Sequence, residues 1–473
     1  MATSQTDMVK TDEKVTLTDN GMVTNPTTLN SCVDLFFSIG AMRGKSKDKV
    51  ISLFNEAYEE NPLVASKVLF WTRDVRSGAG ERQIFRDILS HLVTTSPQTV
   101  RKNIGLIPEF GRWDDVLVLI GTELEGEAFT LIKTALINED GLCAKWIPRK
   151  GDVANKLRKL FKMTPKEYRK MLVNLTNVVE SKMCSNKWGD IDYSKLPSLA
   201  SSRYQKSFLS NDYKRYEDYK KALIDGTAKV NAGAVYPYDI IKSINNGGDK
   251  VVSEKQWESL PNWMENSSEL ILPVVDVSGS MCCPAGNNEK LSCMDVAISL
   301  GMYISERNEG NFKDSFITFS NNPQLQYLTG GLSERLEQLR SADWGMSTDL
   351  EAVFNLILNQ AKTFDIPQDK MPTKIMILSD MQFNEATRRG DMGANPMIDT
   401  MYEEAGYKKP DIVYWNLNST GANFPVEFNE NGTALVSGFS PSILKSILGG
   451  KNMTPESILM DTVNDERYSV ITI

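Results

Sequence analysis

Histidine is almost absent from this sequence, which contains only His91 among its 473 residues. Hydrolysis by a Ser-His-Asp or Cys-His arrangement, and zinc binding through imidazole, would each have to use this one side chain. Because His91 also falls within a helical pattern, both kinds of chemistry are improbable. We therefore expect a protein that is not an enzyme, with weak metal-dependent cleavage of phosphoesters as the remaining catalytic alternative.

Cysteines are few, and none of them forms a CxxC pair. The six are Cys32, Cys143, Cys184, Cys282, Cys283 and Cys293. Uneven spacing of this kind is typical of reduced thiols, so we expect a cytoplasmic protein. The last three lie close together, but without a nearby histidine we expect them to pack rather than to bind zinc.

Long apolar stretches are also missing. No run reaches about 18 residues, the length that a membrane-spanning helix needs. The first thirty or so residues are polar with mixed charge and do not resemble a signal peptide. We expect neither a membrane span nor a membrane partner.

Charge is present but unevenly distributed. The net charge is −8, with 37 Lys and Arg against 31 Asp and Glu in residues 1–250, and 16 against 30 in residues 251–473. Residues 145–221 hold 19 basic and 8 acidic residues. An acidic protein with one concentrated basic segment is expected to bind a polyanion through that segment.

The length predicts two or three domains. Apolar periodicity is helical from Leu29 onward, and many short amphipathic helices without strands between them predict an all-α stack of HEAT or armadillo type. We expect a flexible arm, the helical repeat domain, an interdomain segment, an α/β domain and a C-terminal tail that packs back on either domain. Their ranges are 1–28, 29–221, 222–268, 269–450 and 451–473.

Strands and helices alternate in the C-terminal part, which predicts a doubly wound parallel sheet. The expected strands are 271–276, 314–319, 373–379, 411–417 and 433–437. The expected helices lie near 291–306, 332–340, 348–362, 395–405 and 441–448.

Five oxygen-bearing side chains stand at loops of this α/β domain. Asp276, Ser278 and Ser280 follow an apolar strand, Thr348 stands at a loop-to-helix junction, and Asp380 ends a second strand. Carboxyl ends of parallel strands meet at one edge of a sheet. Oxygen ligands suit Mg²⁺, or less selectively Mn²⁺ or Ca²⁺. The alternative is that these residues cap helices and form turns without a metal.

In order and spacing, Asp276-x-Ser278-x-Ser280, Thr348 and Asp380 resemble the metal-ion-dependent adhesion site (MIDAS) of von Willebrand factor A domains. The resemblance covers about residues 268–450. It implies that Ser278, Ser280 and Thr348 bind the metal directly or nearly so, whereas Asp276 and Asp380 act largely through waters.

Basic residues beside aromatic or glycine residues are the candidate RNA contacts. Cationic side chains can bind the RNA backbone, and aromatic rings can stack on unpaired bases. The alternatives are solvated helix faces and, near Gly78 and Gly80, an interhelical turn paired by Asp74 and Glu81. The candidates are Arg73, Arg76, Arg82, Arg112, Lys145, Arg149, Lys150, Lys159, Lys187, Arg203 and Lys206.

A helical stack with Gly111-Arg-Trp-Asp-Asp115 and Ala144-Lys-Trp-Ile-Pro148, followed by an A domain, resembles the Ro (TROVE-domain) ribonucleoproteins. That resemblance implies closure of the two domains into a ring that binds small structured noncoding RNA and the single-stranded ends of misfolded RNA. This chain is less basic than the family.

We expect a non-catalytic RNA-binding ring protein with Mg²⁺ at the MIDAS. The alternative is a protein without RNA whose MIDAS binds an acidic group of a protein partner. Such a protein would be a scaffold or assembly component, for example a viral structural or accessory protein.

Overall fold

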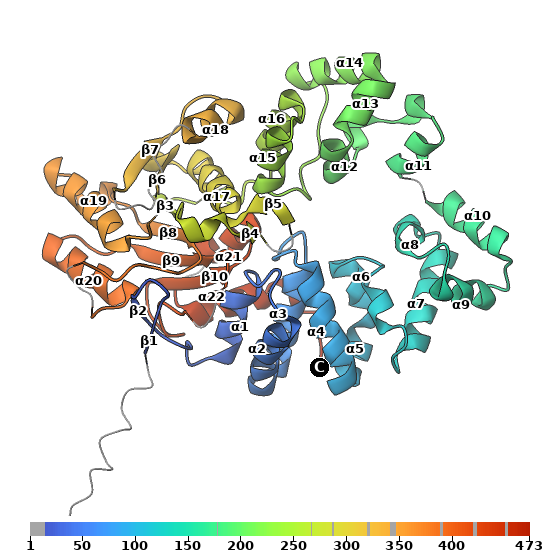
Figure 1. Ribbon diagram of the computed structural model, residues 1–473, viewed down its shortest axis with the longest axis horizontal. Coiled ribbons are helices and arrows are strands. Elements are labelled where there is room, and N and C mark those ends of the chain that lie inside the picture. The colour runs from blue at the N-terminus through green and yellow to red at the C-terminus, as the bar shows by residue number, and fades with distance from the viewer. Residues whose placement is uncertain are drawn as a thin grey trace, which may run out of the picture. The chain divides into compact units, whose positions relative to one another are not determined.

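The computed structural model describes residues 15–176, 178–265, 267–285, 288–318, 322–340, 347–387, 391–419, 423–449 and 453–473 (Figure 1). The chain divides into two compact units, and each is built from several segments. The sheet unit comprises residues 1–61, 236–241 and 262–465, and the helical unit comprises 62–235, 242–261 and 466–473. A helical part and an α/β part were both expected, and both are present.

The sheet has six strands in the order β10-β9-β8-β3-β6-β7. Their bounds are β3 Ile271–Val275, β6 Ser315–Thr318, β7 Gln324–Tyr327, β8 Lys374–Ser379, β9 Asp411–Asn416 and β10 Thr433–Ser437. All neighbours are parallel except β6 and β7, which pair antiparallel. The prediction of a wholly parallel sheet is therefore wrong at this edge, whereas the five expected strands are confirmed.

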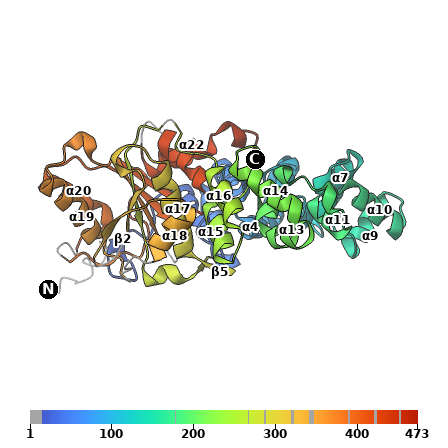
Figure 2. The same ribbon diagram turned by 90° about the horizontal axis from the view of Figure 1, so that it is seen from above.

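The sheet's central strands are buried on both faces, as their continuous apolar runs predicted. Helix α17 packs on β3 and β6, and α19 packs on α20. In the described part of the chain, six α-helices follow β3. They are α17 Cys293–Arg307, α18 Leu332–Arg340, α19 Leu350–Thr363, α20 Ala394–Ala405, α21 Leu444–Gly449 and α22 Pro455–Val463. Figure 2 shows helices α19 and α20 side by side in the sheet unit. A short antiparallel pair, β4 Pro284–Ala285 and β5 Asn288–Ser292, precedes α17.

The N-terminal segment also belongs to the sheet unit. Helix α1 Ser31–Ile39 packs on β10, and α2 Lys47–Glu60 packs on α1. At this contact Ser437 Oγ donates to the Phe36 carbonyl at 2.7 Å, and Gly40 N donates to Ser437 Oγ at 3.0 Å. Periodicity alone predicts these two helices as part of the helical domain 29–221, because it does not distinguish a sheet from another helix as the packing partner.

Residues 15–28 lie in the range that we expected to be a flexible arm, and residues 1–14 of that range lie outside the described part. Within residues 15–28, strands β1 Thr16–Leu17 and β2 Val23–Thr24 pair antiparallel as a hairpin. The residues between the two strands reach the loop after β8, as described below.

The helical unit consists of short helices joined by tight turns. Their bounds are α3 Pro62–Arg73, α4 Arg82–Thr95, α5 Pro97–Asn103, α6 Ile107–Phe110, α7 Glu125–Ile137, α8 Gly141–Trp146, α9 Asp152–Leu160, α10 Pro165–Leu175, α11 Val179–Cys184, α12 Ser198–Arg203, α13 Gln205–Asn211, α14 Tyr213–Ile224 and α16 Lys250–Glu258. Helix α15 Pro237–Asn245 spans the boundary between the units.

A buried ionic cluster holds α3, α4 and the loop after α6 together. The Asp115 carboxylate is fully buried and pairs with Arg73 Nε at 2.8 Å and Arg86 Nε at 2.5 Å. It also accepts from the Arg112 backbone N–H at 2.8 Å. Because removing one partner from a buried pair is costly, this cluster is part of the unit's framework.

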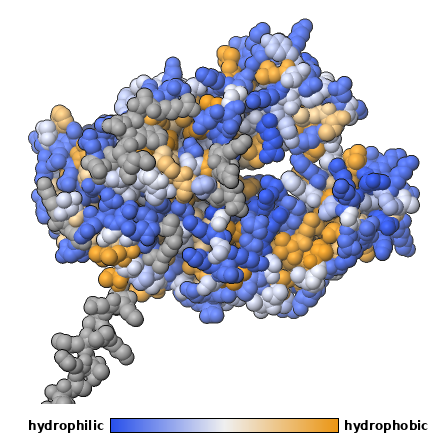
Figure 3. All heavy atoms as spheres, viewed as in Figure 1, coloured by the Kyte–Doolittle hydropathy of each residue, from blue (hydrophilic) through white to orange (hydrophobic). Residues whose placement is uncertain are grey.

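The last residues of the chain complete the helical unit. Arg467 pairs with the buried carboxylate of Asp74, and Tyr468 donates to the same carboxylate at 3.2 Å. The Tyr468 ring stacks on Phe110 with 5.6 Å between the ring centroids. In the view of Figure 3, polar residues cover most of the surface, and apolar residues form separate patches.

Candidate functional site

The loop after β3 is organised by the carboxylate of Asp276. Its Oδ1 accepts from the Ser278 backbone N–H at 2.9 Å, and its Oδ2 accepts from Ser379 Oγ at 2.5 Å. The register of β3 against β8 places these residues side by side, since Val275 lies opposite Leu378. Burial raises the pKa of Asp276. Asp276 therefore fixes the shape of the loop, and Ser379 is a site residue that we did not select from the sequence.

Ser278 and Ser280 bring their hydroxyls together. Their Oγ atoms are 3.0 Å apart, with Ser278 buried and Ser280 exposed. Ser280 lies in the 3₁₀ turn Gly279–Cys282, which directs the chain away from the sheet. Ser278 is thus the more deeply buried of the two, and the Ser280 hydroxyl lies close enough to Asp380 to lower the pKa of that carboxylate.

Asp380 contributes a carboxylate oxygen that lacks a partner. The residue is 2% exposed, its Oδ1 accepts from the Gln382 N–H at 3.3 Å, and its Oδ2 has no hydrogen-bond partner among the described residues. Burial, and then the charge of Asp276, raise the pKa of Asp380 to about 6. Buried polar atoms normally have partners, so this oxygen requires an explanation, and a cation would supply one.

Thr348 stands just before α19 and contacts the loop after β8. Asp349 caps that helix by accepting from the Ala352 N–H at 2.8 Å, which leaves Thr348 outside the helix. The Thr348 carbonyl accepts from the Asn384 N–H at 3.0 Å, and its Oγ1 accepts from Asn20 Nδ2 at 3.2 Å. Asn20 Nδ2 also donates to the Gln382 carbonyl at 2.7 Å, which ties Thr348 to the loop that carries Asp380. The preceding Trp344 to Met346 lie outside the described residues.

These donors fit a hard divalent cation. The set holds two carboxylates and three hydroxyls, and Mg²⁺ prefers such oxygen ligands. Among the described residues, no three His, Cys, Asp or Glu side chains form a metal-binding group. A cation held mainly by the neutral hydroxyls would leave positions open for waters or for an anionic group of a partner.

The cysteines beside the loop pack against each other. Cys283 and Cys293 have their Sγ atoms 3.5 Å apart, and Cys283 Sγ also accepts from Asn418 Nδ2 at 3.3 Å. All six cysteines are free thiols. Cys282, adjacent in sequence, is exposed.

The predicted RNA contacts do not all converge. Arg73 is 1% exposed and paired with Asp115, so its guanidinium belongs to the buried ionic cluster and not to a surface. Arg76 is exposed and donates to the Glu109 carbonyl at 3.4 Å. The other exposed candidates are Arg82, Arg149, Lys150, Lys159, Lys187, Arg203 and Lys206.

Three of the candidates line one cavity of about 650 Å³ formed by α8, α11, α12 and the loops beside them. They are Arg112, Lys145 and Arg203. Lys182 and Lys195, which we did not select from the sequence, line it as well, against the acids Glu180 and Asp192. Trp146 and Tyr204 supply aromatic surface, and Leu142, Val179, Leu196 and Leu199 supply apolar surface. The cavity is cationic at its polar groups and apolar elsewhere.

Arg112 is the most unusual side chain of this cavity. It is half-buried, and its guanidinium carbon lies 4.5 Å from the Trp146 ring centroid. Burial, and then the charge of Arg73, lower the pKa of Arg112. Neither Arg112 nor Arg203 has an ion-pair partner among the described residues, whereas Lys145 lies 3.5 Å from Glu180 and Lys195 lies 3.3 Å from Asp192. An anion would compensate the charge of Arg112.

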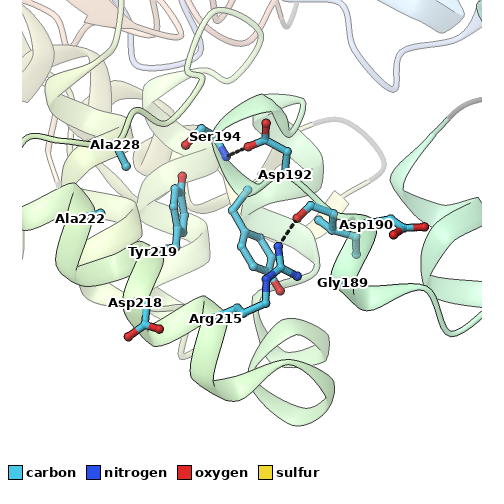
Figure 4. Close-up of a pocket in the computed structure, with 11 residues that line it drawn as sticks. Gly189, Asp190, Asp192, Ser194, Arg215, Asp218, Tyr219, Ala222 and Ala228 are labelled. Carbon is cyan, nitrogen blue, oxygen red and sulfur yellow. Dashed lines mark hydrogen bonds between the residues drawn. The ribbon is translucent and has the colours of Figure 1, made fainter.

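A second cavity, of about 540 Å³, lies between α14 and the residues around Tyr193 (Figure 4). Its only cation in the described lining, Arg215, already donates to the Ile191 carbonyl at 2.7 Å and the Trp188 carbonyl at 2.8 Å. The same side chain pairs with Asp212 at 2.7 Å. Because Arg215 has its hydrogen bonds within the protein, we interpret this cavity as structural.

Comparison with known proteins gives families without an assigned function. Residues 18–145 and 132–270 match the family described as Domain of unknown function (DUF2828). Residues 271–470 match Domain of unknown function (DUF7788). The chain is 28% identical over 508 residues to the uncharacterized protein L728 of Acanthamoeba polyphaga mimivirus, covering 94% of this chain and 86% of that protein. In the described part of the chain, every helix is too short or too polar to cross a membrane.

Proposed function

Given that the chain belongs to the Domain of unknown function (DUF2828) family, we propose that it is a non-catalytic RNA-binding protein. The observation that carries this proposal is the half-buried guanidinium of Arg112, which stacks on Trp146 and lacks an ion-pair partner among the described residues. An arginine in this state is suited to bind an anion in the cavity that it lines.

The rest of the cavity favours RNA over a simple anion. Its apolar lining and the rings of Trp146 and Tyr204 suit an unstacked base, while Arg203 and the lysines suit the phosphates that flank it. The resemblance to Ro proteins supports the same partner, namely small noncoding RNA or misfolded RNA with single-stranded ends. The HEAT-like repeat expected from the helical periodicity and the closed ring implied by this resemblance both stay predictions.

The experiment compares two triple variants with equal changes in charge. Arg112→Gln, Lys145→Gln and Arg203→Gln alter the cavity, whereas Lys47→Gln, Lys49→Gln and Lys313→Gln alter exposed positions of the sheet unit. Fluorescence anisotropy with a hairpin RNA that ends in a single strand measures the affinity. We expect the cavity variant to bind about tenfold or more weakly, with a shallower dependence on salt.

The control variant should stay within about twofold of the natural protein, because long-range charge alone is screened at moderate salt. An equal loss of RNA affinity in both variants would show that the protein attracts RNA only through nonspecific charge. Unchanged affinity in the cavity variant would remove RNA from this site.

A second function is favoured by the cation site of the sheet unit. Here we propose a von Willebrand factor A domain that holds Mg²⁺, or Mn²⁺ or Ca²⁺, through Ser278, Ser280 and Thr348, with Asp276 and Asp380 acting largely through waters. The unpartnered Oδ2 of Asp380 and the exposed Ser280 support it. A cation there would bind a carboxylate of a protein partner.

Isothermal titration with Mg²⁺ and Mn²⁺ tests this second function directly. We expect one site per chain that is lost in Asp380→Asn and retained in Asp369→Asn, an acid outside the set. Partner capture should then require the cation and fail in EDTA. Absence of a titratable site in the natural protein would reject the metal and leave the RNA proposal untouched.

A further inference from the structure

The turn of the N-terminal hairpin is bound to the loop that follows β8. Thr18 Oγ1 donates to the Phe383 carbonyl at 2.7 Å, and the Asp19 N–H donates to Gln382 Oε1 at 2.7 Å. In the other direction, the Glu385 N–H donates to the Asn20 carbonyl at 2.9 Å. Backbone and side-chain groups of the turn thus hold the loop that carries Asp380.

Asn20 differs from Thr18 and Asp19 because its side chain also contacts Thr348, a candidate metal ligand. The amide has two N–H groups, and its Nδ2 lies 2.7 Å from the Gln382 carbonyl oxygen and 3.2 Å from Thr348 Oγ1. The two acceptors belong to the two segments that must meet to form the site. One amide therefore joins the start of α19 to the loop after β8.

This contact limits how the Thr348 hydroxyl can act. A hydroxyl has one proton to donate and two lone pairs that accept. When Asn20 donates to one lone pair, the second lone pair stays available for a cation and the proton for a neighbouring acceptor. Without Asn20, the hydroxyl is free to rotate between its staggered positions.

We propose that Asn20 is a positioning residue of the cation site, acting through Thr348. The proposal rests on the cation site of the preceding section. It makes that site a product of three distant segments, because the hairpin at the start of the chain contributes beside the loops after β3 and β8. Partners of metal ligands typically change metal affinity about 10- to 100-fold when removed.

The test uses Asn20→Ala with Thr18→Val as a matched control. Each variant removes a side-chain hydrogen bond between the hairpin and the loop after β8, but only Asn20→Ala removes the contact with Thr348. Titration with Mn²⁺ should show about tenfold weaker binding for Asn20→Ala and less than about twofold for Thr18→Val. Equal weakening in both would mean that Asn20 merely anchors the hairpin, and would overturn the proposal.

A double-variant cycle separates positioning from general stabilisation. In a Thr348→Val background, Asn20→Ala should change the affinity for Mn²⁺ by less than about twofold, because the group through which it acts is gone. The same tenfold loss in both backgrounds would show that Asn20 does not act through Thr348. If the natural protein binds no cation, the site itself fails, and this inference fails with it.

Discussion

At the scale of single residues, the sheet unit places two carboxylates close together in a buried environment. Asp276 satisfies both of its oxygens with Ser278 and Ser379, whereas Asp380 leaves one oxygen without a partner among the described residues. Both pKa values are raised by burial. The site is therefore unfavourable for the ionised, cation-free protein, and a cation is what would relieve it.

The first prediction concerns the stability of the cation-free protein against pH. The pKa of Asp380 is raised to about 6 in the folded state, against about 3.9 in an unfolded chain. Between these values the unfolded state has lost the proton and the folded state has kept it, so stability falls as pH rises from about 4 to 6. Asp380→Asn should abolish this part of the fall, on the order of 1–3 kcal/mol.

Urea unfolding in EDTA at several pH values, followed by tryptophan fluorescence, measures this effect. Above pH 6 the variant should be the more stable protein, provided that no cation is present. If the free energy of unfolding changed equally with pH in the natural protein and in Asp380→Asn from pH 4 to 6.5, the prediction would be contradicted.

Residue types and their spacing were enough to select the five oxygen-bearing side chains, because each follows a strand or precedes a helix in an apolar pattern, whereas metal binding by them stays a prediction. The role of Asn20 could not be predicted. Asn20 lies in a polar segment without a distinctive pattern, and its contact partner Thr348 is 328 residues away in the sequence. Arg73 illustrates the opposite error. An arginine that ends a helix looks like a surface cation until the fold brings Asp115 to it.

At the scale of elements, apolar runs identified the five mutually parallel strands to within a residue or so at their ends. The sixth, β7, is exposed along most of its length and mainly polar, so it carries none of that signal. Helix α1 has the expected apolar face, but amphipathicity does not say which partner the face covers. Helix α1 packs on β10 of the sheet as well as on α2, and it belongs to the sheet unit.

The second prediction tests the α1 contact at Gly40. A Cβ at this position would lie 2.6 Å from the Ser437 carbonyl oxygen and 2.8 Å from the Gly438 Cα, both of which are backbone atoms. Gly40→Ala should therefore push α1 away from β10 and destabilise that contact by about 1–3 kcal/mol. Faster hydrogen exchange of β10 amides would report it.

Gly105→Ala is the control for this substitution, because no atom lies within 4 Å of the added Cβ. It should change stability by less than about 0.5 kcal/mol. Similar exchange of β10 in Gly40→Ala and the natural protein would show that the contact can open without cost.

At the scale of the whole molecule, each unit is assembled from three separate segments of the chain. The helical unit takes its last segment from residues 466–473, whose Arg467 and Tyr468 bind Asp74. Sequence periodicity reports local structure only, so it could not reveal this assembly.

The third prediction concerns loss of that last segment. A chain that ends at Asp465 leaves the buried carboxylate of Asp74 without Arg467, and breaking such a pair costs about 3–5 kcal/mol. A chain that ends at Tyr468 keeps Arg467 and the ring stack on Phe110, and should lose much less. Hydrogen exchange of α3 and α6 distinguishes the two, and equal protection in both would contradict the prediction.

The interleaving of segments also bears on how such a gene can change over time. Recombination exchanges continuous stretches of sequence, and no continuous stretch encodes either unit in full. A cut between the two matched families, at residues 270 and 271, would leave both pieces incomplete. We therefore expect the two matched regions to be inherited together, and neither region to occur by itself in other proteins.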